Sequence, residues 1–185
     1  MPFGTWWRGT PLPDLSPLRT FSARISTDTQ LITRLANLSK PEIDDRFQTG
    51  KHLYIAFIRE VPVAYGWVAT REVNFPHFQF SFTIPSRNCY LWDFLTLPEW
   101  RGRSIYPHLL QTIIRQEPLV DRFWIGYEPG NEASASGIRK AGFQVVTDFV
   151  IAEGRISGLT LFDSSECAQA SGDFFNLPIV ARTGP

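Results

Sequence analysis

The chain has 185 residues, of which 43% are hydrophobic and 19% are charged, and its eighteen basic residues balance its eighteen acidic ones. This length and composition are typical of one globular domain with a hydrophobic core. A net charge of zero excludes a general attraction to nucleic acid or to an anionic membrane, so any site for an anion must be local. The sequence also contains no run of about 20 apolar residues, which a membrane-spanning helix requires.

The first twenty residues contain four prolines and only two arginines, a composition that fits neither a secretory signal nor an amphipathic transit peptide. We therefore expect a cytoplasmic protein without a nucleic-acid or membrane partner. Cys89 and Cys167 lie far apart without a CxxC pair, and the three histidines are scattered. Neither a metal site nor a disulfide framework is expected, and neither cysteine has the neighbouring histidine pattern of a nucleophile.

Residues 1–19 are rich in proline and are expected to form an irregular arm, which Trp6 and Trp7 should hold against the body rather than leave disordered. Periodicity and turn signals then predict, in chain order, a strand at 20–26, helices at 28–38 and 41–50, strands at 52–58 and 63–70, and a strand or covering loop around 78–82. The second half of the chain is predicted to contain a strand at 90–97, a helix at 103–116, a strand at 122–127, a helix at 131–141 and a hairpin of strands 143–152 and 156–162. This order predicts a single mixed α/β domain over residues 1–185, with residues 163–185 as a C-terminal tail. Strand 90–97, helix 103–116 and strand 122–127 should form a parallel unit.

The turn between strand 90–97 and helix 103–116 carries the clearest chemical signal. Pro98 stops the strand, and Arg101, Gly102 and Arg103 form a tight turn before an amphipathic helix. Free backbone N–H groups and the positive end of a helix dipole would then lie beside two guanidinium groups, which is a typical site for phosphate. The turn has too few glycines for a Rossmann turn and no Gly-Lys-Ser/Thr, which disfavours a nucleoside triphosphate.

Two segments of the chain resemble motifs of the GNAT superfamily of N-acetyltransferases. Residues 101–106 resemble its coenzyme A-binding motif, R/Q-x-x-G-x-G/A, except that Ser104 and Tyr106 replace the two small residues and Pro107 removes one amide donor. We therefore expect a pyrophosphate site of slightly altered geometry. Residues 131–143 resemble the later helix of the family, N-x-x-A/S-x-x-x-Y-x-K-x-G-F, with matches at Asn131, Ser134, Lys140, Gly142 and Phe143.

The resemblance covers residues 50–153 well and the two ends poorly. It implies the GNAT-like acyl-CoA N-acyltransferase fold, a central mixed but mostly antiparallel sheet flanked by helices. It also implies an enzyme without a metal that transfers an acyl group directly from acetyl-CoA or another acyl-CoA to an amine. The backbone of Leu95, Thr96 and Leu97 would pair with pantetheine, and an N–H there would polarise the thioester carbonyl. The other cofactor-binding residues implied by the two motifs are Arg101, Gly102, Arg103, Ser104, Ile105, Tyr106, Asn131 and Ser134.

The group that protonates the leaving thiolate is less clear from the sequence. The family often uses a tyrosine of the later helix, and the corresponding position here is Ile138. Tyr127, at the end of the preceding strand, is a substitute candidate, and the alternative is that it only packs there. Because a thiol has a pKa of about 8.5, loss of the acid would slow the reaction without preventing it.

Asp93 resembles the acidic residue that many relatives direct at the acceptor, so we predict that it assists deprotonation of the amine. It shares strand parity with Leu95 and Leu97, which places all three side chains on one face unless a bulge intervenes. The alternative is an ion pair with a nearby arginine such as Arg71 or Arg87. Glu128 is a weaker candidate, because Glu-Pro-Gly first indicates a turn.

The acceptor is not specified by any motif, and both a small-molecule amine and a peptide amine stay open, as does a homodimer. An aromatic content of 14% suggests an apolar or aromatic amine or a longer acyl group, with Phe47, Phe75, Phe78 and Phe82 as candidates for the pocket, unless these rings only fill the core. Two other functions compete. One is a non-catalytic acyl-CoA-binding or sensing module, favoured by Ile138, Ser104 and Tyr106. The other is a protein-interaction domain, favoured by the aromatic N-terminal arm and by residues 174–179.

Overall fold

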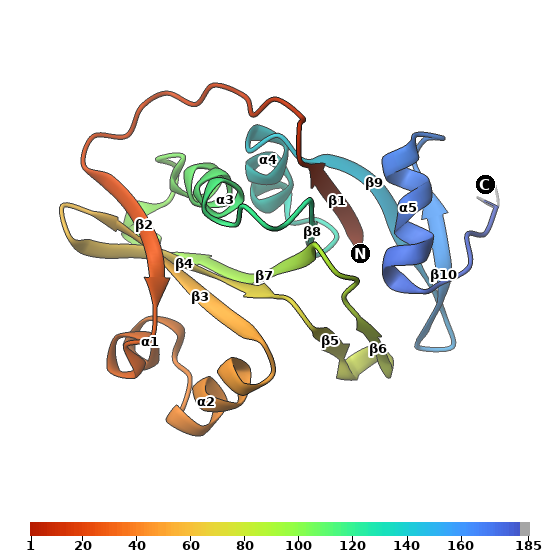
Figure 1. Cartoon of the computed structure of the whole chain (residues 1–185), viewed down its shortest axis with the longest axis horizontal. Helices are drawn as coiled ribbons and strands as arrows, with labels where there is room; N and C mark the ends of the chain where they lie inside the picture. Colours follow the sequence, from red (N-terminus) through yellow and green to blue (C-terminus); the bar gives the residue numbers. More distant parts are fainter. Residues whose placement is uncertain (182–185) are drawn as a thin grey trace.

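In the computed structural model, which describes residues 1–181, an eight-stranded sheet crosses the molecule and helices cover both of its faces (Figure 1). Its strands are β1 (Pro2–Trp7), β2 (Phe21–Ser26), β3 (Lys51–Ile58), β4 (Val61–Ala69), β7 (Asn88–Thr96), β8 (Arg122–Gly126), β9 (Gln144–Ala152) and β10 (Arg155–Leu161), in the spatial order β10-β9-β1-β8-β7-β4-β3-β2. A separate hairpin contains β5 (Glu72–Phe75) and β6 (Phe80–Thr83), joined by a 3₁₀ turn at Pro76–Phe78. The helices are α1 (Thr29–Ala36), α2 (Lys40–Gln48), α3 (Ile105–Gln116), α4 (Glu132–Lys140) and α5 (Glu166–Phe175).

The sheet is mixed but mostly antiparallel, as the sequence predicted. β7 and β8 pair in parallel around the crossover helix α3, and the remaining pairs of the large sheet are antiparallel. Because a crossover connection is long enough to return the chain to the same end of the sheet, this is the expected outcome for the strand–helix–strand unit.

The two faces of the sheet have different covers (Figure 1). α3 and α4 lie on one face, where Leu109, Ile113 and Ile138 are buried in the largest core cluster. α1 and α2 lie on the other face, where Ile32 and Ile43 pack with side chains of β3 and β4. Both of these short helices are capped at their N-terminal ends by side chains. Asp28 accepts the Leu31 N–H, and Ser39 and Glu42 form a capping box.

The first residues differ from the expected irregular arm, because Pro2–Trp7 is a strand in the interior of the large sheet. β1 pairs with β8 on one side and with β9 on the other, and Phe3 is fully buried. A strand that is covered on both faces does not alternate between polar and apolar residues, and proline is tolerated at its first position. These two properties explain why the sequence pattern did not indicate a strand here.

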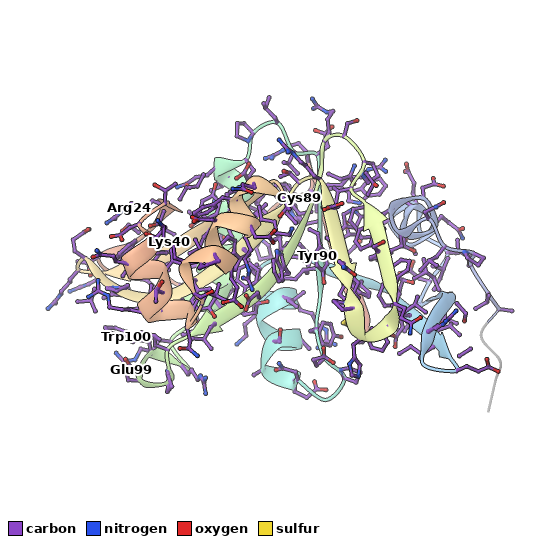
Figure 2. All side chains as sticks on the ribbon, turned by 90° about the horizontal axis from the view of Figure 1, so that it is seen from below. Arg24, Lys40, Cys89, Tyr90, Glu99 and Trp100 are labelled. Atoms are coloured by element: carbon purple, nitrogen blue, oxygen red, sulfur yellow. The ribbon has the colours of Figure 1, made fainter. Side chains whose placement is uncertain are left out.

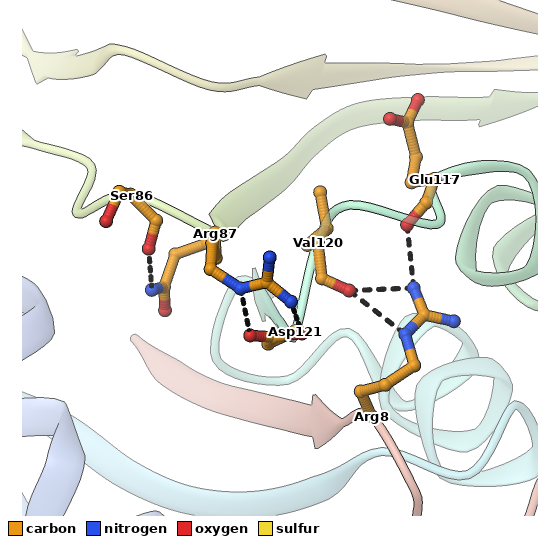
Figure 3. Close-up of polar contacts among 7 residues, drawn as sticks. Arg8, Ser86, Arg87, Glu117, Val120 and Asp121 are labelled. Carbon is orange, nitrogen blue, oxygen red and sulfur yellow. Dashed lines mark hydrogen bonds and ion pairs between the residues drawn. The ribbon is translucent and has the colours of Figure 1, made fainter.

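Residues 8–19 contain no helix or strand and are tied to α3, so this part of the arm agrees with the prediction. The Arg8 guanidinium donates to the backbone oxygens of Glu117 and Val120 at 2.7 Å each, next to the C-terminal end of α3 (Figure 3). Gln111 Nε2 donates to the Pro13 oxygen at 2.8 Å. Lone carbonyls at a helix end are thereby satisfied by a cation, as the helix dipole favours.

The segment expected as a tail includes helix α5, which packs against β9 and β10 (Figure 1). The Phe174 ring stacks on Trp124 at a centroid distance of 4.4 Å, and Phe175 lies at 4.7 Å from Phe3. α5 and the β5–β6 hairpin together cover an aromatic core cluster at this end of the sheet. Within residues 1–181, no helix is both long enough and apolar enough to cross a membrane.

Candidate active site

β7 and β8 separate at the centre of the sheet. Their parallel pairing runs from Asn88 opposite Arg122 to Leu91 opposite Ile125 and then stops. β7 continues along β4 as far as Thr96, whereas β8 ends at Gly126. The carboxyl ends of two parallel strands therefore diverge, and in open α/β sheets such a place is a usual position for a ligand.

A β-bulge shapes β7 at this opening. Trp92 pairs with Trp67 and Leu95 pairs with Tyr65, so that Asp93 and Phe94 both oppose Gly66. Asp93 adopts a left-handed backbone conformation with φ of 50°. A Cβ on Gly66 would lie 2.0 Å from the Phe94 ring, so only glycine lets this ring lie across β4. The sequence predicted that Asp93 and Leu95 share one face of β7 unless a bulge lies between them. Because this bulge does lie between them, strand alternation no longer places the two side chains on one face.

One cavity, with a volume of about 570 Å³, lies between the end of β7, the turn before α3 and the face of α4. We call this 570 Å³ space the cofactor cavity. It is lined by Phe94, Leu95, Thr96, Trp100, Arg101, Gly102, Ser104, Ile105, Tyr106, Pro107, Asn131, Ala133, Ser134, Ser136, Gly137 and Lys140. Nine of the predicted cofactor-binding residues are in this lining, and the other two, Leu97 and Arg103, are not.

The turn before α3 presents backbone N–H groups to the cofactor cavity. Gly102 and Ser104 are both left-handed, with φ of 76° and 58°. Ser104 therefore adopts the conformation for which the motif usually has glycine, which is costly for an L residue but tolerated. The amides of the first turn of α3 have no acceptor inside the helix, apart from Pro107, which has none to offer. Arg101 Nε donates to the Thr96 oxygen at 3.1 Å and ties the turn to the end of β7.

The backbone of Thr96 faces the opening between the strands. Thr96 pairs with Ala64, and the next amide, that of Leu97, donates to the Val63 oxygen at 2.9 Å. Successive residues of an antiparallel strand direct their N–H groups to opposite sides, so the Thr96 N–H points away from β4. Its carbonyl points the same way, where it accepts the bond from Arg101. Thr96, rather than Leu97, has an amide directed at the opening.

α4 supplies the opposite wall of the cofactor cavity. Asn131 is its N-cap, and the Asn131 Oδ1 accepts the Ser134 N–H at 3.0 Å. Ile138, at the position of the usual tyrosine, is fully buried in the core and lies outside the cavity. A Cβ on Gly137 would lie 2.4 Å from Cδ1 of Tyr106, so glycine at this place lets the tyrosine ring fit against the helix.

A second cavity of about 580 Å³ lies on the other side of the opening, next to the β5–β6 hairpin. We call it the acceptor-side cavity. It is lined by Met1, Lys51, Val73, Asn74, Phe75, Pro76, His77, Phe78, Tyr90, Trp92, Asp93, Phe94, Tyr106, Gly126, Tyr127, Glu128, Asn131 and Ser134. The residues that it shares with the cofactor cavity are Phe94, Tyr106, Asn131 and Ser134. Figure 2 labels one residue of each cavity, Tyr90 of the acceptor-side cavity and Trp100 of the cofactor cavity.

No protein-family model and no curated protein matches the sequence. Solved structures do match. AAC(6')-Iy, in complex with a bisubstrate analogue of coenzyme A and acetylneamine, aligns with a TM-score of 0.54 and 15% identity over 72% of this chain and 97% of its own. A GNAT family acetyltransferase from Elizabethkingia anophelis with acetyl-CoA bound aligns with a TM-score of 0.53 and 14% identity over 75% of this chain and 93% of its own. A GCN5-related N-acetyltransferase from Kribbella flavida aligns with a TM-score of 0.55 and 14% identity over 78% of this chain, which spans only 53% of that longer protein.

This chain has the GNAT acetyltransferase fold. The fold class that the two motifs implied is therefore confirmed. The matched structures include complexes with coenzyme A or acetyl-CoA. Because identities below 20% establish a fold and not a substrate, the roles of individual residues rest on the geometry of this chain.

Within this GNAT fold, Asp93 forms an ion pair with an arginine that the sequence did not suggest. Arg46 Nη1 of α2 donates to Asp93 Oδ2 at 2.6 Å, and its guanidinium carbon lies 4.7 Å from the Trp67 ring centroid and 4.5 Å from that of Trp92. The expected partners are engaged elsewhere. Arg87 forms a bidentate pair with Asp121 (Figure 3), and the Arg71 side chain lies against Gly50.

The structure brings both predicted catalytic residues, Asp93 and Tyr127, to the acceptor-side cavity. Tyr127 follows β8 and donates its backbone N–H to the Pro2 oxygen at 3.1 Å. Glu128 lines the same cavity, and its carbonyl accepts the Asn131 N–H at 3.0 Å, so it belongs to a turn as well. Tyr106 lines both cavities, and burial raises the pKa of its hydroxyl well above the ordinary value.

The predicted pocket phenylalanines divide into two groups. Phe75 and Phe78 line the acceptor-side cavity. Phe47 instead packs near Trp67 with a centroid distance of 5.8 Å, and Phe82 lies 5.1 Å from Phe175 in the aromatic core cluster, as the alternative of core packing proposed. Sequence reasoning missed many other cavity residues, among them Tyr90, Trp92, Phe94, Gly137 and Lys140. Of these, Lys140 could have been found, because it is in register with the later-helix motif.

The structure also describes the surroundings of the cysteines and the grouping of side chains that could bind a metal. Cys89 is fully buried, and burial raises the pKa of its thiol. A buried thiol with a raised pKa is a poor nucleophile. Among residues 1–181, no three or more histidine, cysteine, aspartate or glutamate side chains gather in a way that could hold a metal ion.

Proposed function

We propose that this protein is an N-acyltransferase that moves an acyl group from acetyl-CoA or another acyl-CoA directly to an amine. The observation that carries this proposal is the pair of cavities of similar volume that meet where β7 and β8 diverge. A transferase without a covalent intermediate needs two substrates bound at once with their reacting atoms in contact. Two cavities with a common wall meet that need.

The cofactor cavity suits the phosphate end and the pantetheine arm of an acyl-CoA. The amides of the Gly102–Tyr106 turn and the positive end of α3 favour a pyrophosphate, and Lys140 on α4 adds a cation on the opposite wall. In this proposal Arg101 both holds the turn and contributes charge, while Asn131 and Ser134 contact the arm. Leu95 and Thr96 form the strand edge along which pantetheine would lie.

The Thr96 N–H is the donor that would polarise the thioester carbonyl. It is directed at the opening, whereas the Leu97 N–H is already bonded to the Val63 oxygen. A fixed backbone donor costs no reorganisation when charge develops on the carbonyl oxygen, which is why such donors are effective in acyl transfer. Of the backbone N–H groups of residues 95–97, this proposal therefore assigns the one of Thr96 to the thioester carbonyl.

The acceptor-side cavity suits an amine with an apolar or aromatic body. Phe75, Phe78, Tyr90 and Trp92 provide rings in its wall, and Asp93 provides a carboxylate. An alkylamine with a pKa of about 10.4 is almost wholly protonated at neutral pH, so a carboxylate both attracts it and accepts its proton. Whether the amine belongs to a small molecule or to a peptide is left to experiment.

A coenzyme A release assay across a panel of amines tests the proposed function. We expect turnover with acetyl-CoA, fastest with 2-phenylethylamine and tryptamine and slower with spermidine, amino acids and short peptides, since the cavity has more rings than unpaired carboxylates. Coenzyme A affinity measured by calorimetry without turnover for any amine would favour a non-catalytic acyl-CoA-binding module. No affinity for coenzyme A at all would favour an interaction domain and overturn the proposal.

The turn before α3 is tested by Gly102→Pro. Gly102 has φ of 76°, which proline cannot adopt, and proline also removes one amide donor. We expect coenzyme A binding to weaken at least tenfold, or about 1.4 kcal/mol. The matched control is Gly154→Pro, because Gly154 has φ of 74°, has open space around it, and lies in the β9–β10 turn away from both cavities. Equal affinity in the two variants would contradict the assignment of the turn to pyrophosphate.

A further inference from the structure

The two cavities share only four of their lining residues, and this shared wall fixes where the chemistry must occur. Under the proposed function, on which this inference rests, the acyl thioester enters from the cofactor cavity and the amine from the acceptor-side cavity. The carbonyl carbon and the sulfur must then lie beside the common residues Phe94, Tyr106, Asn131 and Ser134. Any side chain that protonates the sulfur should belong to this set.

Three of these four side chains are polar, and they differ as proton donors. The Asn131 carboxamide is the N-cap of α4 and carries no acidic proton. The Ser134 hydroxyl is an ordinary alcohol, which is far less acidic than a phenol. Tyr106 carries a phenol, whose unperturbed pKa of about 10 is the nearest of the three to that of a thiol, about 8.5.

The Tyr106 ring is held in place from two sides. The Phe94 ring, which the β7 bulge directs across Gly66, lies at a centroid distance of 5.3 Å from it. On the other side, Gly137 of α4 leaves the space that the ring needs. Burial raises the pKa of Tyr106, and a hydrogen bond with Ser134 offsets this only in part, so the hydroxyl keeps its proton at neutral pH.

We infer that Tyr106 donates the proton that coenzyme A needs when it leaves. The position of this donor is the first turn of α3, where the sequence motif usually has glycine or alanine, rather than the position of Ile138 on α4. This assignment also gives a reason for the departure of the motif from its usual pattern at residue 106. Tyr127 lines only the acceptor-side cavity, which places it on the side of the amine.

The reaction step balances with this donor. The amine nitrogen forms a bond to the carbonyl carbon, and the C–S bond then breaks with its electron pair on sulfur. The Tyr106 hydroxyl gives its proton to the sulfur, and the resulting phenolate takes up the proton that the new amide nitrogen loses, through water. The products are an amide and the free thiol of coenzyme A. Because the thiolate forms in the same buried place, desolvation raises the basicity of both partners and does not by itself oppose the transfer.

The test compares Tyr106→Phe with the parent protein. Phenylalanine keeps the ring between Phe94 and Gly137 and removes only the hydroxyl. We expect kcat to fall about 10²-fold, within the range of general acid catalysis, while coenzyme A affinity and the KM of the amine change less than threefold. Tyr54→Phe is the matched control, because Tyr54 is a buried tyrosine that lies outside both cavities, and it should keep the parent kcat.

A change of leaving group separates a proton donor from a merely structural hydroxyl. The selenoester analogue of acetyl-CoA releases a selenolate, which is a much weaker base than a thiolate and needs no proton to leave. With the selenoester as the acyl donor, the ratio of the parent kcat to the Tyr106→Phe kcat should be at least tenfold smaller than with the thioester. An equal loss with thioester and selenoester would overturn the inference, and so would a normal kcat in Tyr106→Phe together with a loss in Tyr127→Phe. A parent protein that binds no coenzyme A would instead overturn the proposed function.

Discussion

At the scale of single residues, Asp93 has two neighbours that imply different roles. It lines the acceptor-side cavity, where a base is needed, and it is bonded to Arg46, whose guanidinium lies over two tryptophan rings. The side chains of Arg46 and Asp93 are 18% and 32% exposed, so their pairing is only partly desolvated. Pairs of this kind contribute little to stability, on the order of 1 kcal/mol or less. Stability alone is therefore a weak reason for an aspartate at this place.

Asp93→Asn keeps the shape of the side chain and removes its charge. If Asp93 accepts the proton of the amine, kcat should fall by about 10²-fold, with coenzyme A affinity nearly unchanged, because the cofactor is held by the turn and by backbone groups. Measuring kcat, coenzyme A affinity and the melting temperature on this one variant distinguishes the two roles. Normal turnover with a lower melting temperature would remove Asp93 from the mechanism.

Arg46→Met is the partner variant. Methionine can still lie over the Trp67 and Trp92 rings, because it is unbranched and makes favourable contacts with aromatic rings. It removes the cation and keeps the Asp93 carboxylate. We expect this variant to retain most of its turnover. If both variants lose the same stability and the double variant loses no more, the pair is structural.

At the scale of elements, the contact between α3 and α4 is made through a glycine. Gly137 is in the interior of α4, where alanine would normally stabilise a helix by about 1 kcal/mol. A Cβ at this position would, however, lie 2.4 Å from Tyr106, so the ring must move toward the cavities. We therefore expect Gly137→Ala to lower kcat and coenzyme A affinity together, as measured by turnover and calorimetry.

Gly172→Ala is the control for that prediction, because Gly172 is in the interior of α5 and its new Cβ would meet the end of a flexible side chain at 3.3 Å, away from both cavities. It should leave kcat at the parent value. A loss of similar size in both variants would mean that small helical glycines affect only the general packing.

The elements that the sequence specified correctly are those with local signals. α1, α2 and α4 begin at caps that the chain itself supplies, and α3 has an apolar stripe that follows the helical period. β1 was missed because a strand buried on both faces has no alternating pattern, and its partners, β8 and β9, lie more than 100 residues away in sequence. Its place in the sheet is a property of tertiary structure only.

In the candidate site, too, the contiguous parts could be predicted from the sequence, and the parts that depend on tertiary contacts could not. The turn at 101–106 is contiguous, so its residues could be named from the sequence, and nine of eleven predicted cofactor residues line one cavity. The pairing of Asp93 with Arg46 joins residues 47 positions apart, and no spacing rule predicts it. The acceptor-side cavity depends on how the β5–β6 hairpin lies against β7 and β8, and its aromatic residues could be suggested only from composition.

At the scale of the whole molecule, the interior contains several tyrosines whose hydroxyls are removed from water. Burial raises the pKa of Tyr65 to about 12, and it raises the pKa values of Tyr54, Tyr90 and Tyr106 further. In the unfolded chain each of these groups would ionise near pH 10. The folded state therefore resists ionisations that the unfolded state accepts.

The sign of the resulting pH dependence follows from linkage. A group whose folded pKa is raised contributes stability that is fully present below its unfolded pKa and is lost as pH rises toward the folded pKa. For these tyrosines the loss begins near pH 10 and, for Tyr65, continues to about pH 12.

We expect the melting temperature to be nearly constant between about pH 8 and 9.5 and to fall steeply above about pH 10, with tyrosinate absorbance appearing in the same transition as unfolding. Tyr65→Phe should make the fall less steep, because one ionisation that favours the unfolded state is then absent. Tyrosinate absorbance that rises well before unfolding would show that these hydroxyls reach water in the folded protein, and it would also weaken the argument that Tyr106 keeps its proton beside the leaving sulfur.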